Sequence, residues 1–362
     1  MTGFVPPPYP YDRLKPIIAT AQGHDGGAVD LSIGDPCDPP MPAVLAALAD
    51  EGSVRRYPPS LGTAAYREAA AGWLRRRLGA TVDPQTELAA CVGTKEYVAS
   101  TPHYLKLRTP DKDTVLYPAI SYPTYAMGAE LAGLRAVPYR RLDEISERDG
   151  ERALLLWVNS PANPTGELAD LAAAAGWGRQ RNVPVFSDEC YAEFTFAGEP
   201  TSILRQGPAG LVAVHSLSKR DNFAGARIGF YAGDAELVHY LSEVRKHAGL
   251  MAPGPVQGAA VIALNDDEHV RRQRQAYGSR LSRLVEVLAA LGYPARRPDG
   301  SFYLWVPAPG GDAWAAAQDL AEKVGVVVSP GEFYGPAGAD HFRVAAVAPD
   351  ERIELLARRA GL

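Results

Sequence analysis

Cysteine and lysine are both scarce in this chain of 362 residues. Its three cysteines, Cys37, Cys91 and Cys190, lie far apart and form no CxxC pair. The sequence therefore predicts neither a disulfide framework nor a metal site, and this cysteine usage fits a reducing cytoplasm. Lysine occurs seven times against thirty arginines, so each lysine merits individual inspection as a candidate functional group.

A long apolar run and a strong net charge are also missing. The opening MTGFVPPPYPYDRLKP has no basic segment followed by an apolar one, so no secretory signal peptide is expected. The longest uncharged stretch, residues 248–265, contains Pro253, Gly254 and Pro255, which predicts a loop leading into a buried helix rather than a membrane span. The net charge of −5 comes with scattered basic residues. We therefore expect a cytoplasmic protein with no nucleic-acid partner and no membrane partner.

Short apolar runs alternate with helical patterns along most of the chain. The apolar runs predict strands at residues 88–92, 114–118, 152–158, 183–189, 211–218 and 226–233. Helical patterns fall between several of them, near residues 95–108, 124–133 and 168–181. Strands that are apolar on both faces and are separated by helices predict an α/β fold with a mostly parallel sheet covered by helices. Ligands of such sheets bind beyond the carboxyl ends of the strands.

The length of the chain predicts two domains. Residues 1–42 are rich in proline and glycine, which predicts an extended N-terminal arm, and we expect this arm to pack with the small domain. Residues 43–265 form the predicted large domain. Residues 266–362 begin with a long charged helical pattern and are predicted to form a smaller α+β domain.

Three polar motifs lie at the ends of three consecutive predicted strands: the first follows its strand, and the other two end theirs. They are NSPANPTG at residues 159–166, SDECY at 187–191 and HSLSK at 215–219, with Arg227 eight residues beyond Lys219. Because the carboxyl ends of parallel strands meet at one edge of a sheet, their polar groups are expected to converge. This ordered set resembles the class I and II aminotransferases, which have fold type I and depend on pyridoxal 5′-phosphate. The resemblance covers nearly the whole chain and implies a transaminase with a large cofactor-binding domain.

Lys219 and Asp188 are the predicted catalytic residues. Pyridoxal phosphate is held covalently by a lysine amine, and in the family this lysine also moves a proton at the substrate α-carbon, so Lys219 would act as base and acid in turn. A carboxylate beside the pyridine nitrogen keeps it protonated, and the family places this role on the first acid of DE, Asp188, rather than on Glu189. The alternatives are a solvated surface lysine and, for Asp188, a helix cap or a salt-bridge partner.

The resemblance also implies the cofactor ligands. Asn163 and Tyr191 would donate hydrogen bonds to the phenolic oxygen of the cofactor, and Tyr122 would stack on its ring. The phosphate would be bound by a strand-to-helix turn, two hydroxyls and an arginine, namely Gly93, Thr94, Lys95, Ser216, Ser218 and Arg227. Tyr57 matches the tyrosine that reaches the phosphate of the partner subunit, which implies a homodimer with shared active sites. Without the resemblance these are ordinary turn, core and surface residues.

Substrate binding is predicted for Gly34, Asn163 and Arg343. Arg343 lies in the apolar segment HFRVAAV, where a guanidinium is costly unless it meets an anion such as the substrate α-carboxylate. A buried structural salt bridge is the alternative. Gly34 resembles the family glycine whose backbone meets the same carboxylate.

Further segments resemble the N-succinyldiaminopimelate aminotransferases of high-GC bacteria, which serve lysine and diaminopimelate biosynthesis. They include VGTKE, PAISYPTY, EVRKHAGLMAPGPVQ and PGEFYGPAGADHFRV. This likeness implies N-succinyl-LL-2,6-diaminopimelate and 2-oxoglutarate as substrates. Candidates for the distal succinyl carboxylate are Arg55, Arg56, Arg297 and Lys15. The chain departs from the family in the stretch RDNFAGAR after Lys219 and at Ser301, where a glycine is expected, so specificity can differ.

Other functions stay open at this point. A transaminase for another amino acid or a β-lyase would use the same scaffold, because the fold alone does not fix the reaction. A regulator that senses pyridoxal phosphate is disfavoured, because only about forty residues precede the first expected helix and leave no room for a DNA-binding module. A cofactor-free α/β binding protein is the remaining alternative.

Overall fold

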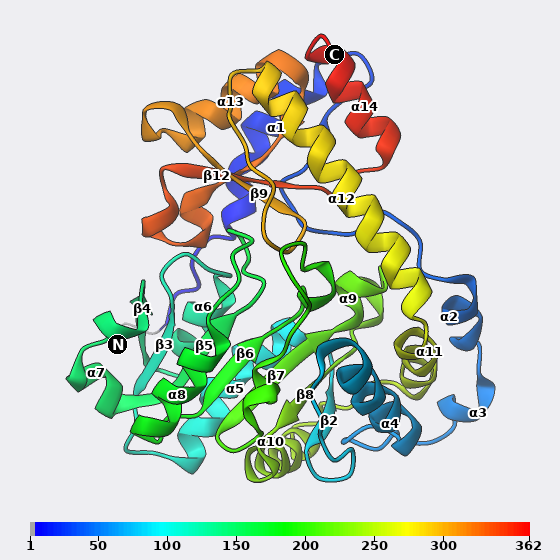
Figure 1. Cartoon of the computed structure of the whole chain (residues 1–362), viewed down its shortest axis with the longest axis vertical. Coiled ribbons are helices and arrows are strands. Elements are labelled where there is room, and N and C mark those ends of the chain that lie inside the picture. Colours follow the sequence, from blue (N-terminus) through cyan, green and yellow to red (C-terminus); the bar gives the residue numbers. More distant parts are fainter. Residues whose placement is uncertain (1–3) are drawn as a thin grey trace. The chain divides into compact units, whose positions relative to one another are not determined.

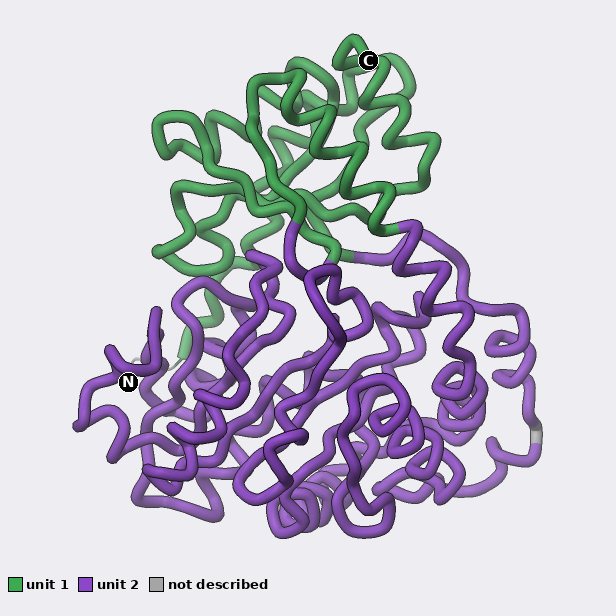
Figure 2. The backbone as a smooth tube through the Cα atoms, viewed as in Figure 1, with its two compact units in different colours: residues 1–34, 277–297, 302–362 green, residues 35–276, 298–301 purple. Residues whose placement is uncertain are grey.

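The computed structural model describes residues 4–362, apart from the side chain of Glu51. The first three residues of the predicted arm lie outside the described residues. The chain forms two compact units, shown in two colours in Figure 2. The small unit comprises residues 1–34, 277–297 and 302–362, and the α/β unit comprises residues 35–276 and 298–301. The domain boundaries expected after residues 42 and 265 stay predictions.

A seven-stranded sheet forms the centre of the α/β unit, with the strand order β2-β8-β7-β6-β5-β3-β4 (Figure 1). Its strands are β2 (Leu88–Cys91), β3 (Thr114–Pro118), β4 (Arg135–Tyr139), β5 (Ala153–Asn159), β6 (Val185–Asp188), β7 (Leu211–Ser216) and β8 (Gly229–Gly233). All neighbours are parallel except that β8 is antiparallel to both β2 and β7. This mostly parallel sheet confirms the predicted α/β fold class.

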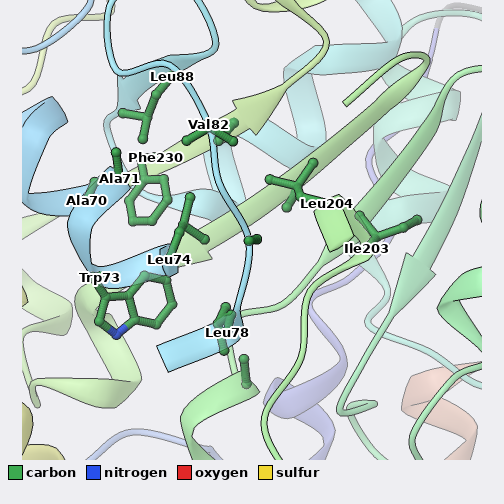
Figure 3. Close-up of a cluster of buried hydrophobic side chains, with 14 of the residues drawn as sticks. Ala70, Ala71, Trp73, Leu74, Leu78, Val82, Leu88, Ile203, Leu204 and Phe230 are labelled. Carbon is green, nitrogen blue, oxygen red and sulfur yellow. The ribbon is translucent and has the colours of Figure 1, made fainter. Parts of the chain in front are cut away.

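Helices cover both faces of this sheet. The helices that contribute to the α/β unit are α2 (Pro42–Ala47), α3 (Glu51–Val54), α4 (Ala64–Trp73), α5 (Thr94–Arg108), α6 (Thr124–Leu131), α7 (Glu147–Arg152), α8 (Leu171–Arg181), α9 (Leu217–Arg220), α10 (Ala235–His247), α11 (Gly254–Asn265) and the first part of α12 (Asp267–Ala290). Side chains alternate between the faces along a strand, so Leu156 and Val158 of β5 join the core under α4, α8 and α11, whereas Leu155 and Trp157 join the core under α5, α6 and α10. Figure 3 shows part of the first core, where Trp73 and Leu74 lie near Phe230.

The structure differs from the sequence-based prediction at particular elements. Strand β4 was not predicted, because its RAVPY sequence contains an arginine and a proline and it lies at the edge of the sheet, where exposure is tolerated. Helix α10 was also missed. The strand expected at residues 211–218 ends at Ser216, and Leu217 begins α9. Helix α4 continues into a π-helical turn, Leu74–Leu78.

The small unit has its own sheet and helices. Strands β9 (Tyr303–Pro307), β12 (His341–Ala345) and β11 (Ser329–Pro330) form an antiparallel sheet, and β1 (Val29–Asp30) pairs in parallel with β10 (Val326–Val327). Its helices are α1 (Lys15–Gln22), α13 (Ala313–Val324), α14 (Asp350–Arg359) and the last part of α12.

The expectation of an extended N-terminal arm is wrong over residues 10–22. A 3-10 turn, Pro10–Leu14, leads into α1, and α1 contacts α13. Leu14, Ile17 and Ala21 are buried at helical spacing, while Pro16 lies in the first turn of α1, where a missing N–H is tolerated. The apolar period of IIATA therefore outweighs the proline-rich composition. Within residues 4–362 no helix is both long and apolar enough to cross a bilayer.

Candidate active site

The three polar motifs follow three neighbouring parallel strands, β5, β6 and β7 (Figure 1). Asn159 at the end of β5 is paired in register with Asp188 at the end of β6, and its Nδ2 donates to the Asp188 carbonyl oxygen at 2.9 Å. The backbone N–H of Asn163 in turn donates to Asn159 Oδ1 at 2.7 Å. Lys219 lies in α9, directly after β7. Asn163, Asp188 and Lys219 are thus presented from the same edge of one sheet.

The carboxylate of Asp188 is buried and is held by neutral donors. Tyr125 of α6 donates its hydroxyl to Oδ2 at 2.9 Å, and the backbone N–H of Cys190 donates to Oδ1 at 3.1 Å. Within residues 4–362 no lysine or arginine forms an ion pair with Asp188. Burial raises the pKa of Asp188, whereas hydrogen bonds from Cys190 and Tyr125 oppose the rise. A cationic ligand atom beside this carboxylate would offset the cost of its burial.

The neighbouring acid, Glu189, has a different environment. Its Oε1 accepts a hydrogen bond from the backbone N–H of Ile203 at 2.8 Å, and its Oε2 lies 3.3 Å from Nε2 of His215. His215 packs against Trp73 on the α4 side of the sheet, opposite to the Tyr125 side. The two adjacent acids therefore project to opposite faces, and of the two only Asp188 accepts a hydrogen bond from the hydroxyl of Tyr125.

Tyr125 was not singled out from the sequence. Its ring stacks on Trp157 with centroids 5.2 Å apart and meets the ring of Tyr122 edge-on at 6.0 Å. The sequence feature that could have pointed to Tyr125 is its position three residues after Tyr122, since this spacing places both side chains on one side of a helical turn. The sequence could not show that Asp188 lies at the same place.

Gly93 and Arg227 come together at the amino end of α5. Gly93 has a φ of +88°, and a Cβ added there would lie 2.1 Å from Nη2 of Arg227. The guanidinium therefore packs on the glycine backbone, and Arg227 also donates from Nη1 to the carbonyl oxygen of Ala224 at 2.9 Å. A helix N-terminus beside a guanidinium is a donor set suited to a phosphate group.

The remaining predicted phosphate ligands lie at the ends of the same elements. Thr94 opens α5, and its hydroxyl lies 3.4 Å from Sγ of Cys190, which links this turn to the one after β6. Ser216 caps α9 by accepting a hydrogen bond from the backbone N–H of Ser218 at 3.0 Å. Lys95 is exposed.

Two predicted tyrosines differ sharply in burial. Tyr191 is buried directly after β6. Tyr57 lies just after α3, is 92% exposed and forms no hydrogen bond within residues 4–362. A single chain therefore leaves the Tyr57 side chain accessible.

Arg343 lies in a buried aromatic cluster of the small unit. Its guanidinium is sandwiched between the rings of Tyr303, at 4.1 Å, and Tyr334, at 4.7 Å. Its Nη2 donates to the carbonyl oxygen of Ser32 at 2.6 Å and to the hydroxyl of Tyr11 at 3.4 Å. The hydroxyls of Tyr11 and Tyr334 are 3.0 Å apart. None of these three tyrosines was predicted, because their contacts join segments far apart in sequence.

Gly34 belongs to the same cluster. A Cβ at this position would lie 2.0 Å from the hydroxyl of Tyr303, so only glycine lets the chain pass so close to this ring. Gly34 and Arg343, the two substrate residues predicted in this unit, thus both contact Tyr303.

The departures from the family pattern have structural consequences. Ser301 is buried and has a φ of +64°, a conformation that favours glycine. In the stretch after Lys219, Arg220 pairs with Asp221 at 2.9 Å and packs on Trp73 at 5.4 Å, and Asn222 donates to Gln273 at 2.8 Å. The first three residues of this stretch are thus tied into the buried interior.

The described part of the chain contains no cluster of three or more histidine, cysteine, aspartate or glutamate residues placed to hold a metal ion. The donors at Gly93 and Arg227 and the buried carboxylate of Asp188 suit a phosphorylated, cationic ring. Residues 27–359 match the protein family described as Aminotransferase class I and II.

Individual relatives cover nearly the whole chain. It is 43% identical to the 4-dedimethylamino-4-oxo-anhydrotetracycline transaminase OxyQ of Streptomyces rimosus, with 98% of each chain covered. It is 34% identical to an LL-diaminopimelate aminotransferase of Dehalococcoides mccartyi, over 98% of this chain and 96% of that protein. The solved structure of a probable N-succinyldiaminopimelate aminotransferase from Thermus thermophilus is similar with a TM-score of 0.86 and 31% identity, over 98% of this chain and all of that one. The chain belongs to the class I and II aminotransferases.

Proposed function

We propose that this aminotransferase exchanges an amino group between glutamate and a 2-amino-6-oxopimelate, with N-succinyl-LL-2,6-diaminopimelate and 2-oxoglutarate as the first substrate pair to test. The observation that carries the chemistry is the placement of Asn163, Asp188 and Lys219 at or shortly after the carboxyl ends of three neighbouring parallel strands. The similarity to aminotransferases described as acting on LL-diaminopimelate and N-succinyldiaminopimelate supports the choice of substrate.

The family uses pyridoxal 5′-phosphate, and the residues present fit this cofactor. Gly93, the amino end of α5 and Arg227 would hold its phosphate, and the buried carboxylate of Asp188 would face its ring nitrogen. When bound, the cofactor supplies an electron sink for the bond broken at the substrate α-carbon.

The side chains of the protein would then bind the substrate and move protons. The amine of Lys219 would take the proton from the α-carbon of the amino donor and, in the second half of the exchange, deliver a proton to the α-carbon of the acceptor. Asn163 and Tyr191 would donate hydrogen bonds to the cofactor oxygen. Arg343, fixed by its aromatic cluster, would hold the α-carboxylate together with the backbone at Gly34. These roles extend the sequence-based predictions.

We also propose that the protein acts in the cytoplasm as a homodimer with shared active sites. Three apolar or aromatic side chains near α2 and α3 support a partner surface, since Tyr57 is 92%, Val54 65% and Leu45 46% exposed. In the dimer, Tyr57 of one protomer would reach the cofactor phosphate of its partner.

A second candidate substrate follows from the 43% identity to OxyQ, whose name describes a transaminase for an oxo-anhydrotetracycline. The second candidate function is therefore amination of a polycyclic ketone. It uses the same proton transfer by Lys219 and differs only in the acceptor.

The test is an assay of the purified protein with pyridoxal phosphate, glutamate as donor and each candidate keto acid or ketone as acceptor. Formation of 2-oxoglutarate with one acceptor supports transamination of that compound. A parallel incubation with a β-substituted alanine such as an S-alkylcysteine, without an acceptor, would yield pyruvate plus ammonia if the protein were a β-lyase. A colourless protein unaffected by borohydride would indicate a cofactor-free binding protein.

Replacement of the proposed catalytic lysine gives the sharpest control. Lys219→Ala is expected to abolish the absorbance of the imine between the lysine and the cofactor, and the transamination, while the unfolding temperature of the cofactor-free protein stays within a few degrees. Lys246→Ala is the matched control, because Lys246 is an exposed lysine on α10 whose one ion pair within residues 4–362 is with Glu243 at 3.6 Å. Transamination retained by Lys219→Ala would contradict the assignment.

A further inference from the structure

An ion pair lies within one helical turn of the proposed phosphate site. Glu96 is in the first turn of α5, three residues after Gly93. Arg245 of α10 binds it with two guanidinium nitrogens, since Nη1 donates to Oε1 at 3.2 Å and Nη2 donates to Oε2. The Arg245 side chain is 2% exposed and the Glu96 side chain 29% exposed. A nearly buried cation from a distant helix is thus committed to this one carboxylate.

Neighbouring groups hold the pair in place. Ser100, one turn further along α5, donates its hydroxyl to Oε1 of Glu96 at 2.8 Å and accepts from Nη1 of Arg245 at 3.1 Å. The Arg245 guanidinium also lies over the ring of Tyr97 at 5.1 Å, and this ring stacks on Tyr231 of β8 with centroids 4.5 Å apart. The two charges are therefore fixed between α5, α10 and the sheet.

The pair and Arg227 act on the same buried atom. The thiol of Cys91, at the end of β2, is buried two residues before Gly93. Burial raises the pKa of this thiol to about 12, while Arg245 and Arg227 lower the pKa and Glu96 raises it. All three charged groups are therefore close enough to the strand-to-helix turn for their charges to act there.

The charge of Glu96 by itself would oppose the binding of a phosphate. A phosphate monoester carries a charge of about −1.5 to −2 at neutral pH. A carboxylate in the first turn of a helix interacts favourably with the helix dipole, so it competes with an anionic ligand for the same positive end. Arg245 supplies the compensating charge, because the guanidinium and the carboxylate together carry no net charge.

We infer that Arg245 raises the affinity of this turn for the cofactor phosphate by neutralising Glu96. The inference rests on the proposed function and assigns Arg245 as a positioning residue that acts through Glu96 rather than on the cofactor itself. Loss of Arg245 leaves one uncompensated negative charge near the phosphate, whereas loss of the Glu96 charge leaves one uncompensated positive charge. The two single substitutions should therefore change phosphate affinity in opposite directions. A pair with only a structural role would weaken binding in both variants.

The test compares two ligands, pyridoxal phosphate and pyridoxal, which lacks the phosphate. Each is titrated into the cofactor-free full-length protein, and the Kd is measured by protein fluorescence. Arg245→Met is expected to raise the Kd for pyridoxal phosphate roughly 10- to 100-fold, and Glu96→Gln to lower it several-fold. The double variant, which lacks both charges, is expected to return to within about 3-fold of the wild type. The Kd for pyridoxal should stay nearly unchanged in all three variants.

Arg108→Met is the matched control. Arg108 ends α5 and pairs with Glu236 of α10 at 3.2 Å, so it joins the same two helices at a distance of about 18 Å from Glu96 along the helix axis. Its replacement is expected to leave the Kd for pyridoxal phosphate unchanged. Urea unfolding of the same samples checks that each variant is folded. If Arg245→Met does not fold, the tighter binding by Glu96→Gln and the recovery in the double variant still decide the question.

The outcomes separate this inference from the proposed function. Equal losses of affinity for pyridoxal phosphate and pyridoxal in Arg245→Met, weaker binding of pyridoxal phosphate by Glu96→Gln, or no recovery in the double variant would overturn the inference. Transamination by the wild type would then leave the proposed function standing. Opposite shifts in the two single variants without transamination of any donor would refute the proposed function and leave the inference standing.

Discussion

Gly93→Ala tests whether Gly93 and Arg227 form the phosphate site. The φ of +88° strains any residue with a Cβ by roughly 1–2 kcal/mol. The added carbon would also lie 2.1 Å from Nη2 of Arg227, so the guanidinium must leave its present position. Loss of a charge-assisted hydrogen bond to phosphate costs about 1.5–3 kcal/mol. We therefore expect the Kd for pyridoxal phosphate to rise roughly 10- to 150-fold.

The assay titrates pyridoxal phosphate into cofactor-free protein and follows the change in protein fluorescence, beside urea unfolding of the same samples. Gly133→Ala is the matched control, because Gly133 has a φ of +67° and nothing lies within 4 Å of an added Cβ. Both variants are expected to lose about 1–2 kcal/mol of unfolding free energy from backbone strain, but only Gly93→Ala is expected to lose cofactor affinity. Wild-type affinity in Gly93→Ala, or an equal loss in Gly133→Ala, would refute the proposed phosphate site.

Two further predictions concern the small unit and the segment after α9. Tyr334→Phe keeps the ring against Arg343 but removes the hydroxyl that lies 3.0 Å from the hydroxyl of Tyr11. Because Tyr11 also contacts Arg343, KM for the amino acid is expected to rise roughly 2- to 10-fold while kcat stays nearly constant. An unchanged KM in steady-state kinetics would argue against a positioning role for Tyr334. Burial raises the pKa of Asp221 from 3.8 to about 6, despite its pairing with Arg220. The folded protein therefore binds the proton on the Asp221 carboxyl more tightly than the unfolded chain does. The free energy of unfolding should fall as the pH rises from about 4 to 6. The difference between the two pKa values corresponds to about 3 kcal/mol. Urea unfolding at several pH values should show that Asp221→Asn lacks this decline in unfolding free energy. Identical slopes of unfolding free energy against pH for the wild type and Asp221→Asn would contradict the prediction.

The sequence by itself determined the α/β class and the order of the motifs. Strands β5, β6 and β7 are apolar on both faces and end in NSPANPTG, SDECY and HSLSK, so period and composition were enough to place these motifs after strands. The same information failed at β4, whose exposed edge position permits residues atypical of a buried strand, and at α1, where local apolar spacing outweighs proline content.

Only the tertiary structure decided which side chains meet. Tyr125 reaches Asp188 from 63 residues away, and Tyr11 reaches Arg343 from 332 residues away, so no local pattern encodes either contact. Asp188 and Glu189 are adjacent and chemically alike, but the extended chain at the end of β6 directs them to opposite faces of the sheet, Asp188 toward Tyr125 and Glu189 toward His215. The sequence gives the chemical type of each residue, but the hydrogen-bond partners of a side chain depend on how distant segments pack. This packing distinguishes Asp188 from Glu189.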